Sequence, residues 1–557
     1  MVLTVAAATT VALLLVTTFA VTFLANNKKK TKVSSSSTKS RDDVDETDDK
    51  DNGDDDAVVV VKLDEHDLLL LKFDIRPINT LTWFRGNYKQ QPRVGGDDGE
   101  DDVDVDDVVS NLRQRAKLIL AKNPWLAGKL IKEYNNKYNN EPCIIYPKKN
   151  VDDSAIDFDP VVVIDETKSP ISRYDTPLED LERIAREKDL ALSKNDTNEP
   201  LWKITIVPCY KQPTKYFAII MSMSHIVVGG STYYDILTML LSSNNDDTPI
   251  RALNIQRAPN YKEQIQPLEE SNFGEEELYF PSTPQFVHVF LFGMLRSFIS
   301  SKLFQRKVQQ IYLLIDNDKI NEIKRQQQQA ESAEDKGPNN TKTRKVSYIS
   351  TNDILVSWFY NTSLTTYGFM NVDCRINGIF SPHISKSVHA GNYNRLIYYD
   401  TQYDSTTPTL IRRSLQLQEE EDLAPPPTKG STKAQRKRRK LRYQRAITYD
   451  QPLPSYTKCV LLGHAHFGMA TNWATFLSSP PTTPQELNIP SKTSKTEFCC
   501  KQELHIPLTD VSTFMPYTFT ELLIFRPYPG KIAVRIAGYR LPPALRHPPF
   551  ASDNKLR

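Results

Sequence analysis

His225 is the residue of this sequence whose setting best suits catalytic chemistry. It closes an alternating apolar run that shares one face of a predicted strand and consists of Phe217, Ile219, Met221 and Met223. An imidazole at the end of a buried strand can act as a general base, because its ordinary pKa of about 6.5 allows proton transfer in both directions near neutral pH. The alternative interpretation is a core histidine whose ring is satisfied by a hydrogen bond.

The residues after His225 predict a sharp turn and then a helix. Gly229 and Gly230 permit the turn, because glycine adopts backbone angles that other residues avoid. Thr232 and Asp235 have the spacing of a capping box ahead of an apolar helix. The stretch 215–241 is therefore expected to be strand, turn and helix, with the imidazole at the junction.

Several other stretches predict the elements that must hold this segment. Apolar periodicity indicates two amphipathic helices and a turn leading into a strand. A strand just before residue 215 is close enough in sequence to form a hairpin with the strand that ends near His225. A Ser-x-x-Asp pattern predicts the capped start of another helix. In chain order, these elements are expected at 108–121 (helix), 123–130 (turn and strand), 176–193 (helix), 202–207 (strand) and 350–360 (capped helix).

Composition limits the function classes. The chain has 557 residues, 39% of them hydrophobic, and a net charge of +2, so no global field selects nucleic acid or an acidic partner. The six cysteines are scattered and lack C-x-x-C spacing, which argues against a disulfide framework and against a zinc site. We expect a monomer, with no nucleic-acid partner.

The amino terminus has the features of a membrane anchor. Residues 2–25 are uncharged and long enough to span a bilayer, and lysines at 28–30 and 32 follow directly. The positive-inside rule then places the rest of the chain in the cytosol. We expect the anchor to span the membrane of the endoplasmic reticulum. The alternative is a cleaved signal peptide with a secreted or lumenal enzyme. Glycans at the sequons Asn195, Asn339 or Asn361 would establish the lumenal orientation.

Polar tracts separate the folded parts. Residues 97–107 are expected to be an acidic surface loop, and the apolar stretch 286–304 to be a buried helix or one that lies on a membrane. Residues 429–445 hold nine basic residues and no acidic one, and a solvated loop or a contact with anionic lipid is favoured over nucleic-acid binding. The predicted divisions are 1–27 (anchor or signal), 28–57 (disordered acidic tether), 58–250 (N-terminal lobe), 251–345 (crossover with a polar loop insertion at 325–345), 346–545 (C-terminal lobe with a basic insertion at 419–445) and 546–557 (tail).

The segment around His225 resembles the active-site segment of the CoA-dependent acyltransferase superfamily, which includes chloramphenicol acetyltransferase, the BAHD enzymes and condensation domains. The family pattern is H-x-x-x-D-G, and this chain has His225 and Gly230 at its ends, with Gly229 in place of the Asp. Further segments similar to those of the family follow in the family's order, at 123–130, 350–360, 372–380, 389–394 and 469–476.

The resemblance implies an α/β (α+β) fold of two similar lobes, each a mixed sheet with flanking helices, and a tunnel between them that holds the imidazole. It implies that His225 deprotonates an acceptor hydroxyl or amine, which then attacks an acyl-CoA thioester. Asn472, beside Thr471, matches the position of the oxyanion donor. The further candidates for the lining of the tunnel are Ser224, Asn352 and Trp473. Acyl-CoA is expected as a co-substrate, together with a small-molecule acceptor and no bound cofactor or metal.

Gly229 is the main departure from the family. The missing Asp normally pairs with an Arg and holds the histidine loop, and the resemblance gives that Arg as Arg375. A buried cation left without its partner is costly, so we expect Arg375 to pair instead with Asp373 or Asp235.

Other functions are disfavoured or remain open. No G-x-S-x-G elbow, P-loop or dinucleotide-binding glycine pattern occurs. His464 and His466 share a predicted strand face, but no third ligand lies near them in the sequence, so a place in the core or the tunnel is favoured over a metal site. Two alternatives remain, a binding protein that has lost its catalytic activity and a condensation-type enzyme that takes acyl groups from a carrier.

Overall fold

The computed structural model describes the parts of the chain that form the folded body. The predicted membrane anchor, the acidic tether, the stretch 286–304, the basic insertion, His464 and the sequons at 195 and 339 lie outside the described residues. Among the residues that the structure does describe, no helix combines the length and hydrophobicity needed to cross a bilayer. The described residues are 58–72, 75–88, 105–131, 141–147, 158–192, 199–213, 215–242, 250–256, 308–334, 348–363, 365, 367–373, 375, 388–400, 407–415, 466–476, 486–490, 497–508, 519–539, 541–553 and 556.

Six strands form the first sheet, in the order β12-β13-β2-β7-β6-β5. The pairing of β6 with β7 is antiparallel and forms the predicted hairpin, whereas β5 joins β6 in parallel. The sheet is therefore mixed, as predicted. The strands are β2 (Ile78–Tyr88), β5 (Val161–Val163), β6 (Trp202–Pro208), β7 (Tyr216–Met223), β12 (Glu486–Pro490) and β13 (Glu497–Pro507).

The strand β7 lies in the middle of this sheet and is buried on both faces. Phe217, Ile219 and Met221 belong to one hydrophobic core, whereas Ala218 and Ile220 belong to another. The alternation predicted for this strand is therefore confirmed. Its apolar side chains on both faces are typical of a central strand covered on each side.

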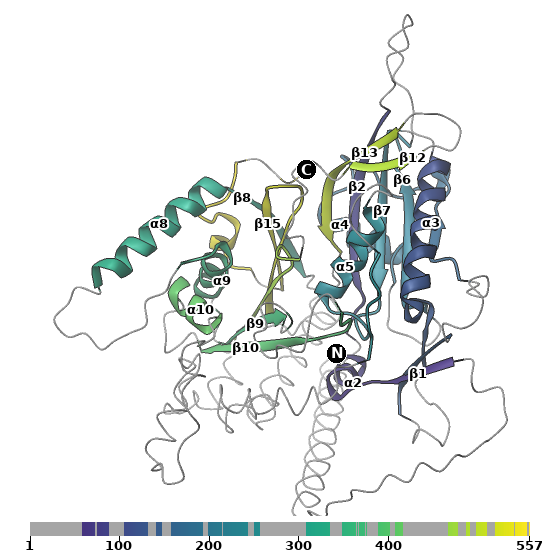
Figure 1. The fold of residues 1–557 in the computed structure, drawn as a ribbon. Helices are drawn as coiled ribbons and strands as arrows, with labels where there is room; N and C mark the ends of the chain where they lie inside the picture. Colours follow the sequence, from purple (N-terminus) through teal and green to yellow (C-terminus); the bar gives the residue numbers. More distant parts are fainter. Residues whose placement is uncertain are drawn as a thin grey trace, which may run out of the picture.

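Helices cover the two faces of the first sheet unequally. Helices α3 (Val105–Lys122) and α5 (Gly230–Leu241) contribute to the core that contains Phe217, and α4 (Leu178–Glu187) packs into the other core. Figure 1 shows α3 and α5 beside the strands of this sheet. The predicted helix at 176–193 is thus shorter than expected.

A small sheet and short helices complete this part of the chain. The predicted turn at 123–130 is a 3-10 helix, η2 (Pro124–Ala127), that leads into a strand. A second 3-10 helix, η4 (Glu166–Lys168), follows β5. The small sheet has the order β1-β4-β3, and the remaining elements are β1 (Val58–Lys62), α2 (Glu65–Lys72), β3 (Lys129–Ile131) and β4 (Cys143–Pro147).

The second sheet also has six strands, in the order β10-β9-β11-β14-β15-β8. The strand β11 runs parallel to both of its neighbours, and the other pairings are antiparallel. The strands are β8 (Gln309–Ile315), β9 (Tyr367–Asp373), β10 (Asn394–Asp400), β11 (Phe467–Asn472), β14 (Phe519–Phe525) and β15 (Ile532–Gly538).

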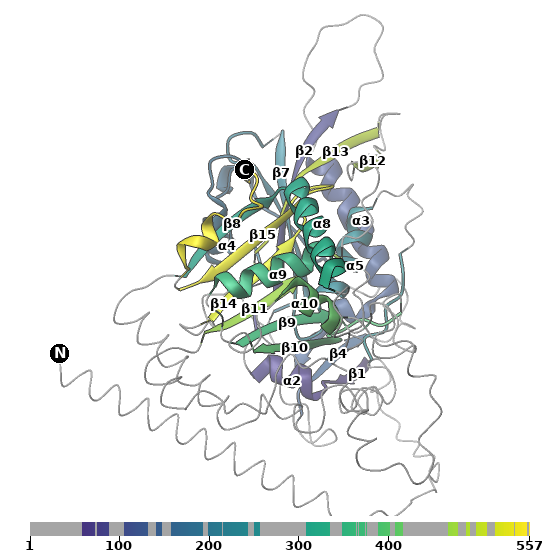
Figure 2. The ribbon, with the colours of Figure 1, turned by 90° about the vertical axis from the view of Figure 1, so that its left-hand side faces the viewer.

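Three helices pack with the second sheet, and Figure 2 shows them over its strands. A shared hydrophobic core includes Ile320 of α8, Phe359 of α9 and Ile411 of α10. The predicted cap of α9 is confirmed, because Ser350 and Asp353 form a capping box. The helices are α8 (Asn317–Glu334), α9 (Thr351–Thr362) and α10 (Pro408–Leu415).

A third core joins the two sheets. It combines Ile220 of β7 and Leu504 of β13 with Leu314 of β8 and Phe525 of β14. Leu556, near the end of the chain beyond η7 (Pro543–Arg546), belongs to the same core. The predicted tail therefore packs against the folded body.

The sheets do not follow the sequence divisions. The strand β8 comes from the predicted crossover but lies at the edge of the second sheet, and the hairpin β12-β13 comes from the predicted C-terminal lobe but completes the first sheet. Strand pairing depends on which sheet edge a segment reaches, and this is not encoded in the local pattern.

Three local predictions were wrong. The strand β7 ends at Met223, so His225 lies in the following turn and not on the strand. The cap residue of α5 is Gly229, with no side-chain cap, and Thr232 and Asp235 bond elsewhere. Residues 325–334 continue α8 and are not part of a loop. Their Gln, Glu and Ala residues are good helix formers, and this preference outweighs their polarity.

Candidate active site

The turn that carries His225 connects β7 to α5 and is folded tightly on itself. The carbonyl oxygen of Ser224 accepts hydrogen bonds from the backbone N–H groups of Val227 and Val228, at 3.2 and 3.3 Å. Every residue of the stretch 221–230 is buried except His225, which is partly exposed. His225 is thus the one partly exposed residue of an otherwise enclosed segment.

The imidazole of His225 has an unusual environment. Its Nδ1 is buried without a hydrogen-bond partner. Burial lowers the pKa of His225 below its usual 6.5, while the backbone of His225 and Val228 and the side chain of Asn392 act in the opposite direction. The ring is therefore neutral near pH 7, which is the protonation state that a general base requires.

Asn392 holds the backbone of this turn from the second lobe. Its side-chain Nδ2 donates to the carbonyl oxygen of His225 at 2.6 Å and to that of Ile226 at 3.2 Å. Asp67 of α2 lies 3.5 Å from the same nitrogen. Asn392 is 1% exposed, so these contacts are shielded from water and are stronger than they would be at the surface.

Gly391 fixes the other end of the turn. Its carbonyl oxygen accepts from the backbone N–H of Gly229 at 3.2 Å, and its own N–H donates to the hydroxyl of Thr232 at 3.2 Å. Gly391 has a φ of 108°, a conformation that residues with a Cβ rarely adopt. Gly391 and Asn392 together therefore hold the turn from both ends.

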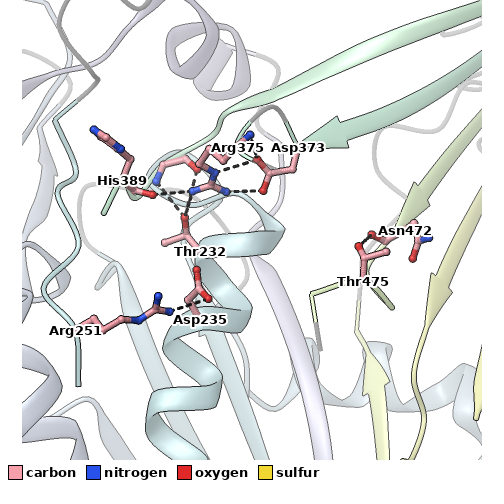
Figure 3. A network of polar contacts seen from close by, with 9 residues as sticks. Thr232, Asp235, Arg251, Asp373, Arg375, His389, Asn472 and Thr475 are labelled. Atoms are coloured by element: carbon pink, nitrogen blue, oxygen red, sulfur yellow. Dashed lines mark hydrogen bonds and ion pairs between the residues drawn. The ribbon is translucent and has the colours of Figure 1, made fainter. Parts of the chain in front are cut away.

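Arg375 fixes the second-lobe segment that contains Gly391 and Asn392. Its Nη1 donates to the hydroxyl of Thr232 at 2.8 Å and to the carbonyl oxygen of His389 at 2.9 Å. Its Nε and Nη2 donate to the two carboxylate oxygens of Asp373, at 3.0 and 2.9 Å. Figure 3 shows the guanidinium between Asp373 and Thr232, near the start of α5.

Asp373 is therefore the partner of Arg375, as one of the two expected pairings proposed. Asp235, the other expected partner, lies farther along α5 and pairs with Arg251 at 3.1 Å (Figure 3). The side chains of Arg375 and Asp373 are both fully buried. A bidentate pair is the geometry in which a buried guanidinium is best compensated.

Gly229 lies where the second lobe approaches the turn most closely. A Cβ at this position would lie 3.1 Å from Nδ2 of Asn394, 3.2 Å from Oδ1 of Asn392 and 3.3 Å from the carbonyl oxygen of Gly391. Amide and carbonyl groups of the second lobe thus surround the site at which the family has a carboxylate. The glycine is required here by close approach and not by its φ of −88°.

Gly230 is the contact point of a different second-lobe segment. A Cβ at Gly230 would meet Cε2 of Phe476 at 2.8 Å and Nε1 of Trp473 at 3.4 Å. The two consecutive glycines thus receive two separate parts of the second lobe. Trp473, a predicted tunnel residue, is 7% exposed and packs close to the His225 turn.

A buried polar chain with aromatic neighbours lies next to this contact. The hydroxyl of Tyr234 is 3.0 Å from Nε2 of His505, whose Nδ1 is 2.8 Å from the hydroxyl of Thr82. The ring of Tyr234 also contacts those of Trp473 and Phe476, with centroids 5.9 Å apart in each case. Burial lowers the pKa of His505 to about 4, so this second histidine is neutral at pH 7.

Asn472 and Asn352, two of the predicted site residues, contact each other. Nδ2 of Asn472 donates to Oδ1 of Asn352 at 2.9 Å, and Oδ1 of Asn472 accepts from the backbone N–H of Ala474 at 2.9 Å. The amide of Asn472 is thus oriented, with one of its two N–H bonds engaged. Ser224 is 3% exposed and contributes the carbonyl that closes the His225 turn.

Sequence reasoning missed three parts of this arrangement. Asn392 lies in the 389–394 segment, where the resemblance gives it no role in the site. The spacing of Thr232 indicates a helix cap, and no sequence motif marks His505. The residues that these three contact lie 143 to 423 positions away in the chain, so no local pattern could identify them. The Gly-Asn pair at 391–392 was the one available signal, because it points to a special backbone conformation.

In the described part of the chain, no three His, Cys, Asp or Glu side chains cluster as metal ligands would. No protein-family model matches the sequence, and no curated protein matches it.

Several solved structures are similar to this one. TRI101 of F. graminearum, complexed with coenzyme A and T-2 mycotoxin, matches at 12% identity and a TM-score of 0.47, over 86% of this chain and 95% of that chain. TRI3 trichothecene 15-O-acetyltransferase from Fusarium sporotrichioides matches at 11% identity and a TM-score of 0.45, over 88% and 92%. The first condensation domain of the calcium-dependent antibiotic synthetase matches at 10% and 0.41, over 86% and 91%. Similarity of this degree leaves function to be argued from the side chains of the site.

Proposed function

We propose that this protein is an acyltransferase that moves an acyl group from acyl-CoA to a hydroxyl or amine acceptor, with His225 as the general base. The observation that carries the proposal is the setting of His225. It is a neutral, partly exposed imidazole on an otherwise buried turn, and it is held from the opposite lobe by Asn392.

The proposed reaction needs one proton carrier. Because Nδ1 of His225 is enclosed, Nε2 is the nitrogen assigned to the acceptor. It takes the proton from the acceptor O–H or N–H, and the freed electron pair attacks the thioester carbonyl carbon. Collapse of the tetrahedral intermediate breaks the C–S bond, and the imidazolium returns the proton to the leaving thiolate. Histidine suits this sequence because both of its protonation states are accessible near neutral pH.

The tetrahedral intermediate places negative charge on the former carbonyl oxygen, which requires a hydrogen-bond donor. We propose that Asn472 supplies it through the N–H bond that is not directed at Asn352. The contacts with Asn352 and Ala474 orient the amide in advance, and a donor fixed before reaction is what lowers the barrier.

The decisive experiment measures release of free CoA by the full chain with a panel of acyl-CoA donors and hydroxyl and amine acceptors. We expect turnover by the wild type and a loss of about 10² to 10⁴ in kcat for His225→Ala. His547→Ala serves as the matched control, because His547 is exposed at the end of a short helix far along the chain. Equal activity of His225→Ala and wild type would contradict the proposal.

A second candidate function is that of a binding protein without catalytic activity. The observation that favours it is Gly229, which stands where the family has a carboxylate. A binding protein without catalytic activity would bind acyl-CoA in calorimetry but release no CoA with any acceptor. A parallel assay with carrier-bound acyl thioesters separates the condensation-type alternative, which requires turnover of those donors in preference to acyl-CoA.

A further inference from the structure

We propose that Asn392 is the positioning residue of His225, and that the Asp373–Arg375–Thr232 network does the work of the carboxylate that is missing at Gly229. The inference rests on the proposed function, because a positioning residue has meaning only if the imidazole acts on a substrate. It assigns Asn392 a role that the sequence resemblance does not give it. It also means that the loss of the family Asp at Gly229 is compensated by other residues.

The hydrogen bond of Asn392 acts on the peptide plane of His225. With Nδ2 at 2.6 Å from the carbonyl oxygen of His225 and at 3.2 Å from that of Ile226, two consecutive peptide planes are fixed. The Cα that carries the ring lies between the His225 carbonyl held by Asn392 and the Ser224 carbonyl, which accepts from the N–H groups of Val227 and Val228. The backbone is therefore held on both sides of the point from which the ring projects. A displacement of a reacting group by about 1 Å can reduce a rate about 10²-fold.

Asn392 is itself fixed through its neighbour. Gly391 bonds to Gly229 through its carbonyl oxygen and to the Thr232 hydroxyl through its N–H. The Thr232 hydroxyl accepts from Arg375 at 2.8 Å. The chain of contacts therefore runs from Arg375 through Thr232 and Gly391 to Asn392, with each member buried.

The charge of this network closes without a group at position 229. Asp373 meets the guanidinium of Arg375 through both of its oxygens, and the remaining nitrogen, Nη1, contacts Thr232 and the carbonyl of His389. Arg375 therefore has its counter-charge without a carboxylate at position 229. The space it would occupy is filled by Asn392, Asn394 and Gly391.

Three charged groups lie close to the segments that form or hold the His225 turn. Asp67 lies 3.5 Å from Nδ2 of Asn392, and Arg375 and Asp373 form the neutral pair behind Thr232. The amide of Asn392 stands between Asp67 and the turn. Replacing the amide therefore changes both the orientation of His225 and the charge that it experiences.

The test compares variants that lose the same hydrogen bond but shift the pKa of His225 in opposite directions. Asn392→Ala removes the donor and also the side chain that favours protonated His225, so the pKa is expected to fall further. Asn392→Asp removes the donor and adds a negative charge, so the pKa is expected to rise. Both are read by NMR titration of ¹³Cε1-labelled histidine in the full chain, with His225 assigned from the His225→Ala spectrum.

Activity separates positioning from a purely electrostatic role. If Asn392 positions the ring, both variants lose about 10²-fold in kcat/KM at their own optimal pH. Asn392→Ser, which keeps a donor on a shorter side chain, is expected to retain more activity than either. The matched control is Asn254→Ala, because Asn254 pairs through its backbone with the same 388–390 segment while its side chain accepts from Gln256.

Two results would overturn the inference. One is an Asn392→Ala protein with kcat/KM within twofold of wild type and an unmoved His225 titration. The other is a loss of activity that is fully restored by adjusting the pH, which would reduce the role of Asn392 to its charge. If the wild type turns over no donor at all, the proposed function fails, but the NMR titration still reports whether Asn392 controls the environment of His225.

Discussion

Arg375 meets both carboxylate oxygens of Asp373, at 3.0 and 2.9 Å, and neither side chain is exposed to solvent. The two residues are separated by one position at the end of β9, so a local carboxylate neutralises a guanidinium that reaches across to Thr232 of α5. This pair is the fixed point from which the second lobe holds the His225 turn.

Removing one member of this pair is expected to destabilise the folded protein far more than removing both. Asp373→Ala leaves a buried guanidinium without its counter-charge and should reduce the free energy of unfolding by about 3 to 5 kcal/mol. The double variant Asp373→Leu with Arg375→Met removes both charges and should recover most of that loss. Urea denaturation measures both, and a double variant that is no more stable than the single one would refute the interpretation.

Restoring the Asp of the family motif at Gly229 is expected to lower the activity of the protein. In Gly229→Asp the new Cβ would lie 3.1 Å from Nδ2 of Asn394, 3.2 Å from Oδ1 of Asn392 and 3.3 Å from the Gly391 carbonyl oxygen, so the larger side chain would crowd the segment that holds His225. The strain should displace Asn392 from His225 and lower kcat/KM by about 10²-fold. Gly229→Ala adds the Cβ without the charge and should lose less. An activity gain in Gly229→Asp would show that the site is degenerate and not compensated.

Gly230 offers a matched test of the other contact between the lobes. A Cβ there would approach Cε2 of Phe476 to 2.8 Å, so Gly230→Ala should cost about 1 to 3 kcal/mol through overpacking. Adding Phe476→Ala removes the clashing ring and should restore part of that stability. Thermal unfolding of the single and double variants measures the coupling. Strictly additive effects would mean that the two residues do not touch in solution.

The pH profile of acyl transfer should report the depressed pKa of His225. A general base works in its neutral form, and burial lowers the pKa of His225 below 6.5. The acidic limb of kcat/KM should therefore fall at a pH below 6.5, with activity constant above it until another group titrates. A limb centred above 6.5 would mean that the ring is stabilised in its charged form.

His505 should make the protein sensitive to acid. It is neutral in the folded state, with a pKa of about 4, against 6.5 when exposed. Between these values the unfolded chain binds more protons, so this contribution to stability is present above pH 6.5 and is lost as the pH falls towards 4, by about 3 kcal/mol.

The variant His505→Asn lacks this titration and isolates its effect. The difference in unfolding free energy between wild type and His505→Asn should narrow as the pH falls from 6.5 to 4. Urea denaturation at several pH values measures that difference, and a constant difference would contradict the assignment.

Much of the architecture was already determined by local sequence. The alternating apolar side chains of β7, the amphipathic spacing of α3 and the Ser350–Asp353 cap depend on neighbours two to four residues apart. Such patterns act through the geometry of the strand and the helix themselves. The same local pattern makes His225 a candidate base, because it follows an apolar strand face directly.

The tertiary structure decided how His225 is held and which segments share a sheet. Asn392 and Arg375 reach the turn from 167 and 143 positions away in the sequence, and the hairpin β12-β13 joins a sheet whose other strands lie far earlier in the chain. These contacts depend on which segments meet when the two lobes pack. At Gly229 the linear motif lacks its carboxylate, whereas in space Asn392, Asn394 and Gly391 surround the position and Arg375 is paired with Asp373. The physical reason that the sequence could not show these surroundings is that the contacts around Gly229 join segments far apart in the chain.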